Sequence, residues 1–315
     1  MKILITGGAG FIGSNLAHAL RRNTYFKTDE LTVVDNLSLG KKKFISSLID
    51  DKKFFFYKTD LLNFHSLLKI FKRHKFDLVW HLSANSDIGY GARFTDWDLK
   101  QGTVATYNVL ECMRRIGTKK IIFSSSSAVL GEAEKMPTPE QYGPLCPISF
   151  YGASKLACEG LLTSFSHNFG FQVWIFRFGN IVGRNSTHGA IYDFIKKLKK
   201  NPRSLEVLGD GTQSKPYLSV DDCVEGMVYG FKHSKNKVNL YNLACEGSTS
   251  VSKIAKNVVR NVNPGAKIQY TGGKRGWRGD VAKVRLDTKN MKALGWVAKC
   301  TSDQAVDKAI TDLVH

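Results

Sequence analysis

The chain has 315 residues, of which 43% are hydrophobic and 23% are charged, and it contains 28 glycines but only 7 prolines. These proportions exclude a disordered, collagen-like or low-complexity chain, and the length suits two domains or one large α/β unit with an added lobe. Lysine and arginine outnumber aspartate and glutamate by 46 to 27, and the resulting net charge of +19 favours anionic partners: nucleic acid, an acidic membrane or phosphate-bearing small molecules.

Basic residues are densest at Lys41–Lys43 and over residues 196–200, where the spacing is that of a solvated helix face. No aromatic-interleaved RNA motif accompanies the charge, so we expect no nucleic-acid partner. The six cysteines are scattered without metal-ligand spacing, which favours reduced thiols and no metal site. The chain starts directly on a strand pattern and has no apolar stretch near the ~18 residues of a membrane span. We therefore expect a cytoplasmic protein that has no membrane partner.

Short apolar runs alternate with longer amphipathic stretches along the first part of the chain. The runs are typical of buried parallel strands, and they begin at Ile3, Leu31, Phe54, Leu78, Ile121 and Val173. A helical apolar period fills the gaps, most clearly over Trp97–Arg115 and Tyr151–His167. Strands and helices alternating in this way predict an α/β fold with a doubly wound, Rossmann-type parallel sheet.

The first expected strand runs into a glycine-rich turn, Thr6-Gly7-Gly8-Ala9-Gly10-Phe11-Ile12-Gly13-Ser14, which opens a helix. Its three spaced glycines leave room for a tight turn and for a pyrophosphate at the helix N-terminus, where free N–H groups point outward. Asp35 ends the second strand 22 residues after Gly13, close to the ~20 expected for a carboxylate that binds an adenosine ribose. This carboxylate would repel a 2′-phosphate, so the pattern favours NAD over NADP, with Lys41–Lys43 as the feature that would serve NADP.

A second group of residues suits proton transfer. Tyr151 and Lys155 are four residues apart at the start of an expected helix, so they share one helix face. The serine run Ser124–Ser127 ends the strand that precedes them. A nearby ammonium and a positive nicotinamide ring would both favour the phenolate, which makes Tyr151 a proton acceptor for a sugar or alcohol hydroxyl.

With these residues the chain resembles the extended short-chain dehydrogenase/reductase family, in particular its NAD-dependent nucleotide-sugar epimerases and dehydratases. The resemblance covers nearly the whole chain and includes, in family order, Val34-Asp35-Asn36-Leu37-Ser38, Thr59-Asp60-Leu61, His81-Leu82-Ser83-Ala84 and Leu208-Gly209-Asp210-Gly211-Thr212-Gln213. It implies that Tyr151 and Lys155 are catalytic, and that Ser126 holds the sugar oxygen beside the Tyr151 phenol.

The resemblance also implies a full set of contacts. The cofactor would be bound by Gly7, Gly10, Phe11, Ile12, Gly13, Asp35, Asn36, Ser38, Asp60, Leu61, Leu82, Ser83, Ala84, Ser124, Tyr151 and Lys155. The substrate would contact Ser126, Tyr151, Asn180, His188, Lys215 and Arg275, with Arg278 as the alternative to Arg275.

The chain departs from the family's pattern at several of these places. Gly102 replaces an asparagine that contacts the cofactor, and Leu130 replaces a frequent tyrosine. Lys215 replaces an arginine, so it would meet a phosphate as a point charge without the guanidinium fork. None of these changes removes the hydride and proton chemistry.

The resemblance further implies how the chain is divided. Residues 1–178 would form an NAD-binding Rossmann domain to which residues 219–244 return. Residues 179–218 and 245–315 would form a smaller C-terminal α/β lobe that binds the nucleotide sugar. Family members are usually homodimers through two helices of the nucleotide-binding domain, here Trp97–Arg115 and Tyr151–His167.

The residues after Ser126 bear on the reaction. Dehydratases and decarboxylating members of the family place an acidic residue directly after the catalytic Ser/Thr, whereas Ser127 and Ala128 follow here. The resemblance therefore implies an isomerase that inverts C4 of a UDP-hexose, of the UDP-glucose/UDP-galactose type, through a transient 4-keto sugar. The alternatives are a nucleotide-sugar dehydratase or reductase of the same family and, from another class, a non-catalytic NAD-sensing or RNA-binding module.

Overall fold

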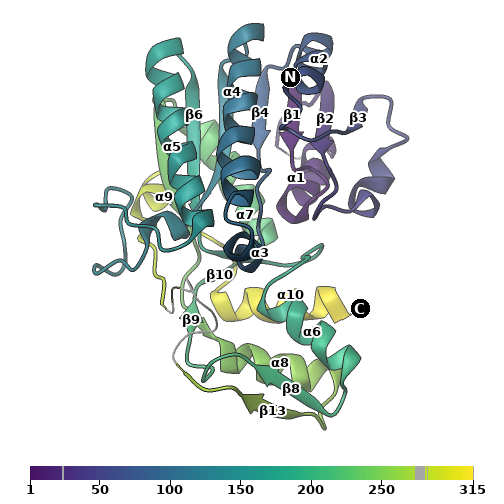
Figure 1. Cartoon of the computed structure of the whole chain (residues 1–315), viewed down its shortest axis with the longest axis vertical. Coiled ribbons are helices and arrows are strands. Elements are labelled where there is room, and N and C mark those ends of the chain that lie inside the picture. Colours follow the sequence, from purple (N-terminus) through teal and green to yellow (C-terminus); the bar gives the residue numbers. More distant parts are fainter. Residues whose placement is uncertain (23–24, 274–280, 282, 315) are drawn as a thin grey trace.

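The computed structural model describes residues 1–22, 25–273, 281 and 283–314. Two parts lie along the long axis of the molecule (Figure 1), and the larger contains a seven-stranded parallel sheet in the order β11-β6-β5-β4-β1-β2-β3. The strands are β1 (Lys2–Thr6), β2 (Glu30–Asp35), β3 (Phe54–Lys58), β4 (Leu78–His81), β5 (Lys120–Ser126), β6 (Gln172–Phe178) and β11 (Val238–Leu243). The expected doubly wound, Rossmann-type sheet is confirmed.

Helices cover both faces of this sheet. One face carries α1 (Phe11–Arg21) and α7 (Val220–His233), and the other carries α2 (Phe64–His74), α4 (Ala105–Ile116) and α5 (Phe150–Phe169). Because successive strand residues point to opposite faces, Ile3 and Ile5 of β1 enter one core and Leu4 enters the other. The sheet therefore has a separate apolar core on each side.

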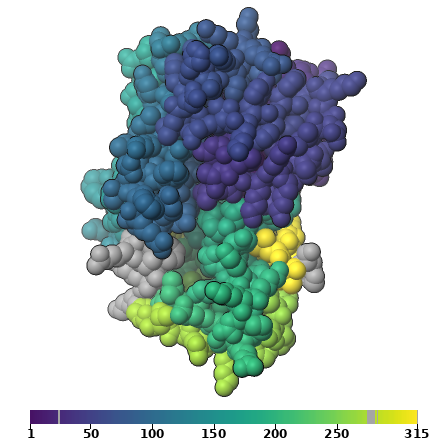
Figure 2. All heavy atoms as spheres, turned by 45° about the vertical axis from the view of Figure 1, so that its right-hand side comes forward, coloured from purple at the N-terminus to yellow at the C-terminus, as the bar shows by residue number. Residues whose placement is uncertain are grey.

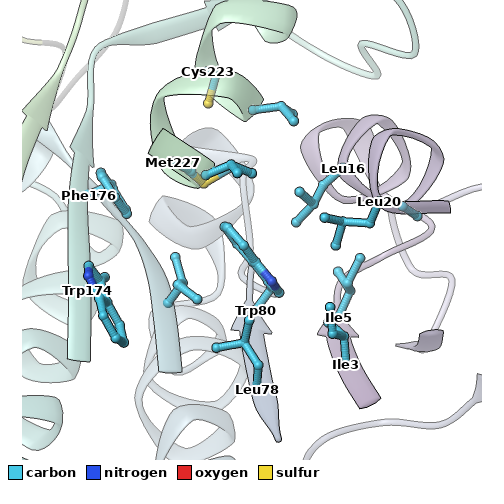
Figure 3. Packing of buried hydrophobic residues seen from close by; sticks show 14 of the residues in the cluster. Ile3, Ile5, Leu16, Leu20, Leu78, Trp80, Trp174, Phe176, Cys223 and Met227 are labelled. Atoms are coloured by element: carbon cyan, nitrogen blue, oxygen red, sulfur yellow. The ribbon is translucent and has the colours of Figure 1, made fainter. Parts of the chain in front are cut away.

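The first of these cores fills the space between the sheet and helices α1 and α7 (Figure 3). Leu16 and Leu20 of α1 and Met227 of α7 lie against Trp80 of β4, whose side chain is fully buried. Burying each large apolar side chain is worth about 1.5–3 kcal/mol. This packing fixes α1, and with it the glycine-rich turn, at the carboxyl end of β1.

One expected helix differs from the structure. The segment Trp97–Arg115 is not a single α-helix, because a π-helical turn, η2 (Leu99–Val104), precedes α4. Gly102 of this turn lies against α5, where a Cβ would be 2.0 Å from Ser154 Oγ. The wider turn and its glycine let η2 approach α5 closely. The short helix α3 (Ile88–Arg93) lies just before it in the chain.

The smaller part is the C-terminal lobe. Three helices pack around its core with the parallel pair β8–β13. Its elements are β7 (Asn180–Val182), α6 (Ala190–Lys200), β8 (Ser204–Val207), β9 (Ser214–Lys215), β10 (Tyr217–Ser219), β12 (Thr249–Ser250), α8 (Val251–Val262), β13 (Lys267–Tyr270) and α10 (Ser302–Val314). Three further short helices lie outside it: η1 (Lys42–Leu48), η3 (Ser127–Leu130) and α9 (Lys289–Ala293).

Helix α6 shows where part of the positive charge lies. Ile195 and Leu198 are buried in the lobe core, whereas Lys196, Lys199 and Lys200 are exposed. The prediction of a solvated lysine face is thus confirmed for this run.

The chain passes repeatedly between the two parts. After β6 it enters the lobe, returns through α7 and β11 to pair with β6, and leaves again for α8. It returns once more at α9, whose Met291 is buried in the sheet core, and then ends in α10. Figure 2 shows the lobe, in green and yellow, lying against one end of the purple and blue part. No helix in the described part of the chain is long and apolar enough to cross a membrane.

Candidate functional site

The glycine-rich turn lies between β1 and α1 at the carboxyl edge of the sheet. Gly7 has a φ of +69°, and a Cβ on Gly13 would be 2.2 Å from the Gly7 carbonyl oxygen. Gly10 precedes α1, and no side chain of the described residues caps the first turn of that helix. Its amide N–H groups can therefore serve a bound anion. The turn has the shape and the donors that a pyrophosphate requires.

Asp35 lies beside this turn, at the end of β2. Its carboxylate accepts hydrogen bonds from the amides of Ala9, at 3.0 Å, and Leu37, at 2.8 Å. Burial raises the pKa of Asp35 above its usual range, and these backbone donors oppose the rise. The two amides orient the carboxylate, whose other lone pairs suit the hydroxyls of a ribose.

A polar cluster follows along the same edge of the sheet. Asn36 Nδ2 donates to Asp60 Oδ2 at 3.0 Å, and Gln101 Nε2 donates to the same oxygen at 3.2 Å. The amide of Ser38 donates to Asn36 Oδ1 at 3.0 Å, and the Leu61 carbonyl accepts a hydrogen bond from an asparagine of α4. Gln101 was not expected from the sequence, because it reaches Asp60 from the π-helical turn.

The segment after β4 closes the other side of the turn. Leu82 donates its amide to the Thr6 carbonyl at 3.2 Å, and a Cβ on Gly7 would be 2.8 Å from the Ser83 main chain. Ala84 continues this segment and is half-buried. The residues expected to bind a cofactor thus lie along one continuous edge, from the glycine turn to β4.

Tyr151 and Lys155 meet the serine run at the end of β5. Lys155 is only 3% exposed, and its Nζ donates to the Ser124 carbonyl at 2.5 Å. The same Nζ lies 5.8 Å from the centroid of the Tyr151 ring, and the Tyr151 side chain is hydrogen-bonded to Ser126. The structure therefore brings the three expected catalytic residues together.

The neighbouring serines have different surroundings. Ser125 is 1% exposed and donates to Glu159 Oε1 at 2.5 Å, while Glu159 is paired with Arg177 at 2.7 Å. Ser126 is only half-buried, and its Oγ accepts a hydrogen bond from the Ala128 amide at 3.2 Å. This arrangement supports Ser126 as the partner of Tyr151 and gives Ser125 a structural role.

Burial acts in opposite directions on the two titratable groups of this site. It raises the pKa of Tyr151 to about 12 and lowers that of Lys155 to about 8. The hydrogen bond from Ser126 opposes the rise of the Tyr151 pKa, and the Asp98 carboxylate adds to it. In the protein alone, burial therefore outweighs the expected effect of the ammonium on the phenol. A phenolate at this position needs a further positive charge beside it.

Apart from Ser126 and Tyr151, the residues expected to contact the substrate come from the lobe side. Asn180 begins β7, and Lys215 ends β9. His188 is exposed in the loop after β7, with its Nδ1 3.1 Å from Thr187 Oγ1. Arg275 and Arg278 lie outside the described residues.

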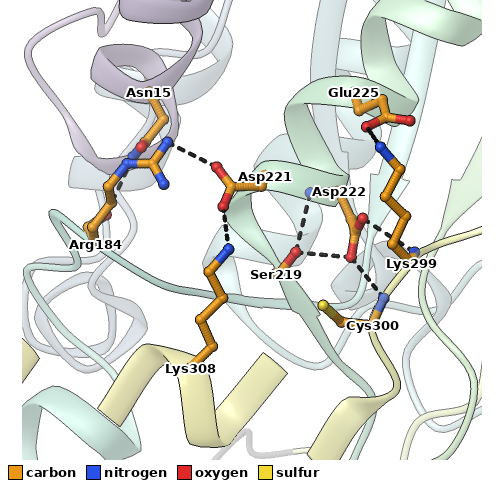
Figure 4. Close-up of polar contacts among 9 residues, drawn as sticks. All are labelled: Asn15, Arg184, Ser219, Asp221, Asp222, Glu225, Lys299, Cys300 and Lys308. Carbon is orange, nitrogen blue, oxygen red and sulfur yellow. Dashed lines mark hydrogen bonds and ion pairs between the residues drawn. The ribbon is translucent and has the colours of Figure 1, made fainter. Parts of the chain in front are cut away.

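The loop after β7 is anchored to both parts of the molecule (Figure 4). Asn15 of α1 donates to the Arg184 carbonyl at 3.2 Å. The Arg184 guanidinium pairs with Asp221 of α7 at 2.7 Å, and Asp221 also pairs with Lys308 of α10 at 2.7 Å. The helix that would hold the pyrophosphate is thus connected directly to the loop that carries His188.

A pocket of about 430 Å³ opens where the segment after β5 meets the lobe. Gln213 is one of its lining residues; it is 3% exposed, and neither polar atom of its amide has a hydrogen-bond partner among the described residues. The lining consists of Glu132, Ala133, Met136, Asp210, Thr212, Gln213, Val281 and Lys283. The sequence showed the Gly-Asp-Gly loop, but no motif marks residues 132–136 as its neighbours.

Comparisons with known proteins cover nearly the whole chain. Residues 3–244 match the model of the NAD dependent epimerase/dehydratase family. The chain is 32% identical to a putative UDP-arabinose 4-epimerase of Arabidopsis thaliana, over 96% of this chain and 77% of that protein. It is 28% identical to the UDP-glucose 4-epimerase of Lactobacillus helveticus, over 95% of this chain and 92% of that protein.

Solved structures agree with these matches. A crystal structure of UDP-galactose 4-epimerase is similar with a TM-score of 0.87 and 34% identity, covering 99% of this chain and 98% of that chain. The UDP-glucose 4-epimerase of Thermotoga maritima, solved with UDP-glucose, gives a TM-score of 0.87 and 28% identity with the same coverage of 99% and 98%. The likeness extends across both the sheet and the lobe.

Proposed function

The chain belongs to the NAD dependent epimerase/dehydratase family, and we propose that it is an isomerase that inverts C4 of a UDP-sugar with the help of NAD. A UDP-hexose of the UDP-glucose/UDP-galactose type is the substrate that we propose. The observation that carries the proposal is the meeting of Tyr151, Lys155 and Ser126 at the carboxyl end of β5, on the same edge of the sheet as the glycine turn and Asp35. The 4-epimerases among the similar proteins support the choice of reaction.

The residues of the sheet edge fit NAD. Gly13 lies so close to the main chain of Gly7 and Gly8 that no side chain fits between them, which gives the tight turn that a pyrophosphate requires, and Asp35 presents an oriented carboxylate to the adenosine ribose. When bound, NAD supplies reversible hydride chemistry and a positively charged ring. The carboxylate of Asp35 would repel a 2′-phosphate, so we propose NAD in preference to NADP.

The chain's own residues handle the proton. Tyr151 accepts the proton of the C4 hydroxyl through its phenol oxygen, while Ser126 holds the sugar oxygen. Since burial raises the pKa of Tyr151 to about 12 with Lys155 already in place, the phenolate depends on a further positive charge, which the nicotinamide ring would add to the Lys155 ammonium. After the sugar has turned over, Tyr151 returns the proton to the 4-keto oxygen. No proton is consumed over the cycle.

The lobe would hold the nucleotide diphosphate. We assign Asn180, Lys215 and His188 to this contact, with Lys215 acting as a point charge. The paired donor and acceptor of the Gln213 amide, buried on the pocket wall, suit the polar edge of a nucleobase. The excess of positive charge over the whole chain would attract a substrate of this charge.

We further propose that the enzyme is a homodimer through α4 and α5. Several large apolar side chains are exposed on these helices and beside them, including Val104 at 39%, Tyr107 at 46%, Phe150 at 49% and Phe169 at 42%. The rings of Tyr107 and Phe169 both contact Phe165, so they belong to one face. An exposed apolar face of this kind is typical of a protein interface.

Proton NMR of the anomeric signals tests the reaction. The purified protein is incubated with NAD and, separately, with UDP-glucose, UDP-galactose, UDP-glucuronate, their N-acetylated counterparts and UDP-arabinose. We expect the C4 epimer of one of them to form without net NADH. A keto-deoxy product would favour the dehydratase alternative, and consumption of added NADH would favour a reductase. An unchanged spectrum with every UDP-sugar would contradict the proposal.

A further inference from the structure

Gln101 has a side-chain contact that the reaction above does not use. It belongs to the π-helical turn η2, between β4 and α4 in the chain, and its Nε2 donates to Asp60 Oδ2 at 3.2 Å. Asp60 follows β3, the strand at the far edge of the sheet. Turns of the π type inside or beside α-helices are frequent at functional sites. The contact therefore joins an unusual turn to one end of the cofactor site.

The main chain around Asp60 is fixed by other residues. The Asn63 amide donates to the Asp60 carbonyl at 3.0 Å. Asn108 of α4 is 8% exposed, and its Nδ2 donates to the Leu61 carbonyl at 2.9 Å. These bonds hold the backbone of the segment, whereas the hydrogen bond from Gln101 acts on the Asp60 carboxylate. The side chain at position 101 thus affects where the carboxylate points more than where the segment lies.

Neutral donors orient the Asp60 carboxylate from two sides. Its Oδ1 accepts the Leu62 amide at 2.8 Å. Its Oδ2 accepts the side-chain amides of Asn36, at 3.0 Å, and Gln101, at 3.2 Å. A carboxylate oxygen has about two lone pairs, so these contacts occupy Oδ2 and leave one acceptor position on Oδ1. Because the donors are uncharged, the carboxylate keeps its negative charge for a ligand.

The open acceptor position lies on the side of the site where the base of the cofactor belongs. The strands β1, β2 and β3 are neighbours in this order, and Asp35 of β2 is in register with Lys58 of β3. With the pyrophosphate at the turn after β1 and the ribose at Asp35, the base comes next to Asp60. Adenine presents a 6-amino donor, which a carboxylate attracts, whereas hypoxanthine presents a 6-carbonyl oxygen, which a carboxylate repels.

We propose that Gln101 is a positioning residue for the base of the cofactor: together with Asn36 it turns the Asp60 carboxylate so that the open lone pair accepts the adenine 6-amino group. The preference of the protein for adenine over a base with a carbonyl at that position then depends on Gln101. The proposal rests on the NAD site proposed above, and it does not depend on which sugar is bound.

The test compares two dinucleotides. Protein freed of co-purified nucleotide is titrated in a calorimeter with NAD and with nicotinamide hypoxanthine dinucleotide, which carries a 6-carbonyl group where NAD carries the 6-amino group. Wild-type protein should bind NAD roughly tenfold more tightly or better, because the analogue loses a hydrogen bond to a charged group.

Gln101→Met keeps the length of the side chain and removes its donor. It should weaken NAD binding by roughly threefold or more and leave the affinity for the hypoxanthine dinucleotide unchanged, so the ratio of the two Kd values should move toward one. Should Gln101→Met fail to fold, Gln101→Leu removes the same donor and carries the same expectation.

Lys100→Met is the matched control. Lys100 is the preceding residue of the same turn, 56% exposed and paired with Asp96 on the surface. Its substitution introduces the same side chain without removing a contact to Asp60. The ratio of the two Kd values should therefore equal that of the wild type.

The outcomes separate this proposal from the proposed function. A Gln101→Met protein in which both dinucleotides weaken equally, or in which neither weakens, would overturn the positioning role. Equal binding of both by the wild type would do the same. Wild-type protein that binds neither would overturn the NAD site as well. A ratio that moves as expected in a protein inactive on every UDP-sugar would support the role of Gln101 and overturn only the proposed reaction.

Discussion

Lys155 is placed where its own charge is unfavourable. Burial lowers the pKa of its ammonium from 10.5 to about 8, so the charged form that the site needs at neutral pH is disfavoured by its surroundings. Below pH 8 the lysine is charged in the folded and in the unfolded chain, and the folded state bears the full cost. Between pH 8 and 10.5 the unfolded chain binds the additional proton, so the free energy of unfolding rises with pH.

Lys155→Met should therefore stabilise the fold while abolishing turnover. At about 1.4 kcal/mol per pKa unit, the gain in the free energy of unfolding at pH 7 is up to about 3 kcal/mol. Urea unfolding at pH 7 and at pH 10 checks this, because the advantage of the variant should shrink as the pH rises. A variant less stable than the wild type at pH 7 would refute the electrostatic account of this lysine.

Tyr151→Phe should remove the acid/base group and leave the cofactor site intact. We expect turnover to fall by roughly 10²–10⁴-fold, the range of a lost general base. NAD released from the denatured holoenzyme should match the wild-type amount, because the substitution leaves the glycine turn and Asp35 unchanged. Turnover at the wild-type rate would exclude Tyr151 as the proton acceptor.

Substitutions of Ser125 and Ser126, which precede η3, distinguish a structural role from a catalytic one. Ser126→Ala should lower kcat roughly tenfold to a hundredfold, and because it removes only a half-buried cap hydrogen bond from the Ala128 amide, it should lower the melting temperature less than Ser125→Ala does. Ser125→Ala removes a buried donor to Glu159, so it should cost about 1–3 kcal/mol of stability. Turnover of each variant is compared with its melting curve, and a reversed pattern would show that the sequence register of the catalytic serine is off by one.

At the scale of elements, the glycine turn and helix α1 act as one unit. Gly13→Ala would place a Cβ 2.2 Å from the Gly7 carbonyl oxygen, so the turn must open and NAD binding should be lost. Gly160→Ala in α5 is the control, since a Cβ there meets nothing within 4 Å and alanine favours a helix interior by about 1 kcal/mol. Calorimetric titration with NAD should show binding in the control and none in Gly13→Ala.

The elements differ in how far the sequence predicts them. The six strand runs and the glycine turn follow from local apolar pattern and local backbone geometry, so they can be found in the sequence without knowledge of the fold. The π-helical turn cannot, because Gly102 is required by Ser154, which lies 52 residues further along the chain. The contacts of Gln101 and Asp98 were not expected for the same reason. Gln101 reaches Asp60, and Asp98 meets Ser154, only when η2 packs against α5.

The pocket near Gln213 depends on contacts over a still longer range. Met136, which precedes β6 in the chain, and Gln213, which follows it, both line this pocket. Lys283 lines it from a third segment. The motifs mark each loop separately but carry no information on which loops meet. Which sugar and which base the protein binds depends on these contacts between loops, so neither can be predicted from the sequence.

For the whole molecule, the exposed face of α4 and α5 is the interface of the proposed homodimer. Tyr107→Glu would place a charge on this face and should convert a homodimer to a monomer, as measured by light scattering after gel filtration. Leu208 is 45% exposed on the lobe, so Leu208→Glu introduces the same charge elsewhere and should leave the mass unchanged. A wild-type mass of one chain would contradict the proposed dimer.

The repeated passage of the chain between sheet and lobe has a consequence for biosynthesis. The edge strand β11 ends at Leu243, and the lobe core includes Val306 and Ile310 of the last helix. A ribosome would therefore have to release the chain through Ile310 before the lobe core could close. Until then the emerging polypeptide would expose the apolar faces of α6 and α8, so the interval between the synthesis of α8 and that of α10 is when a chaperone would be needed most.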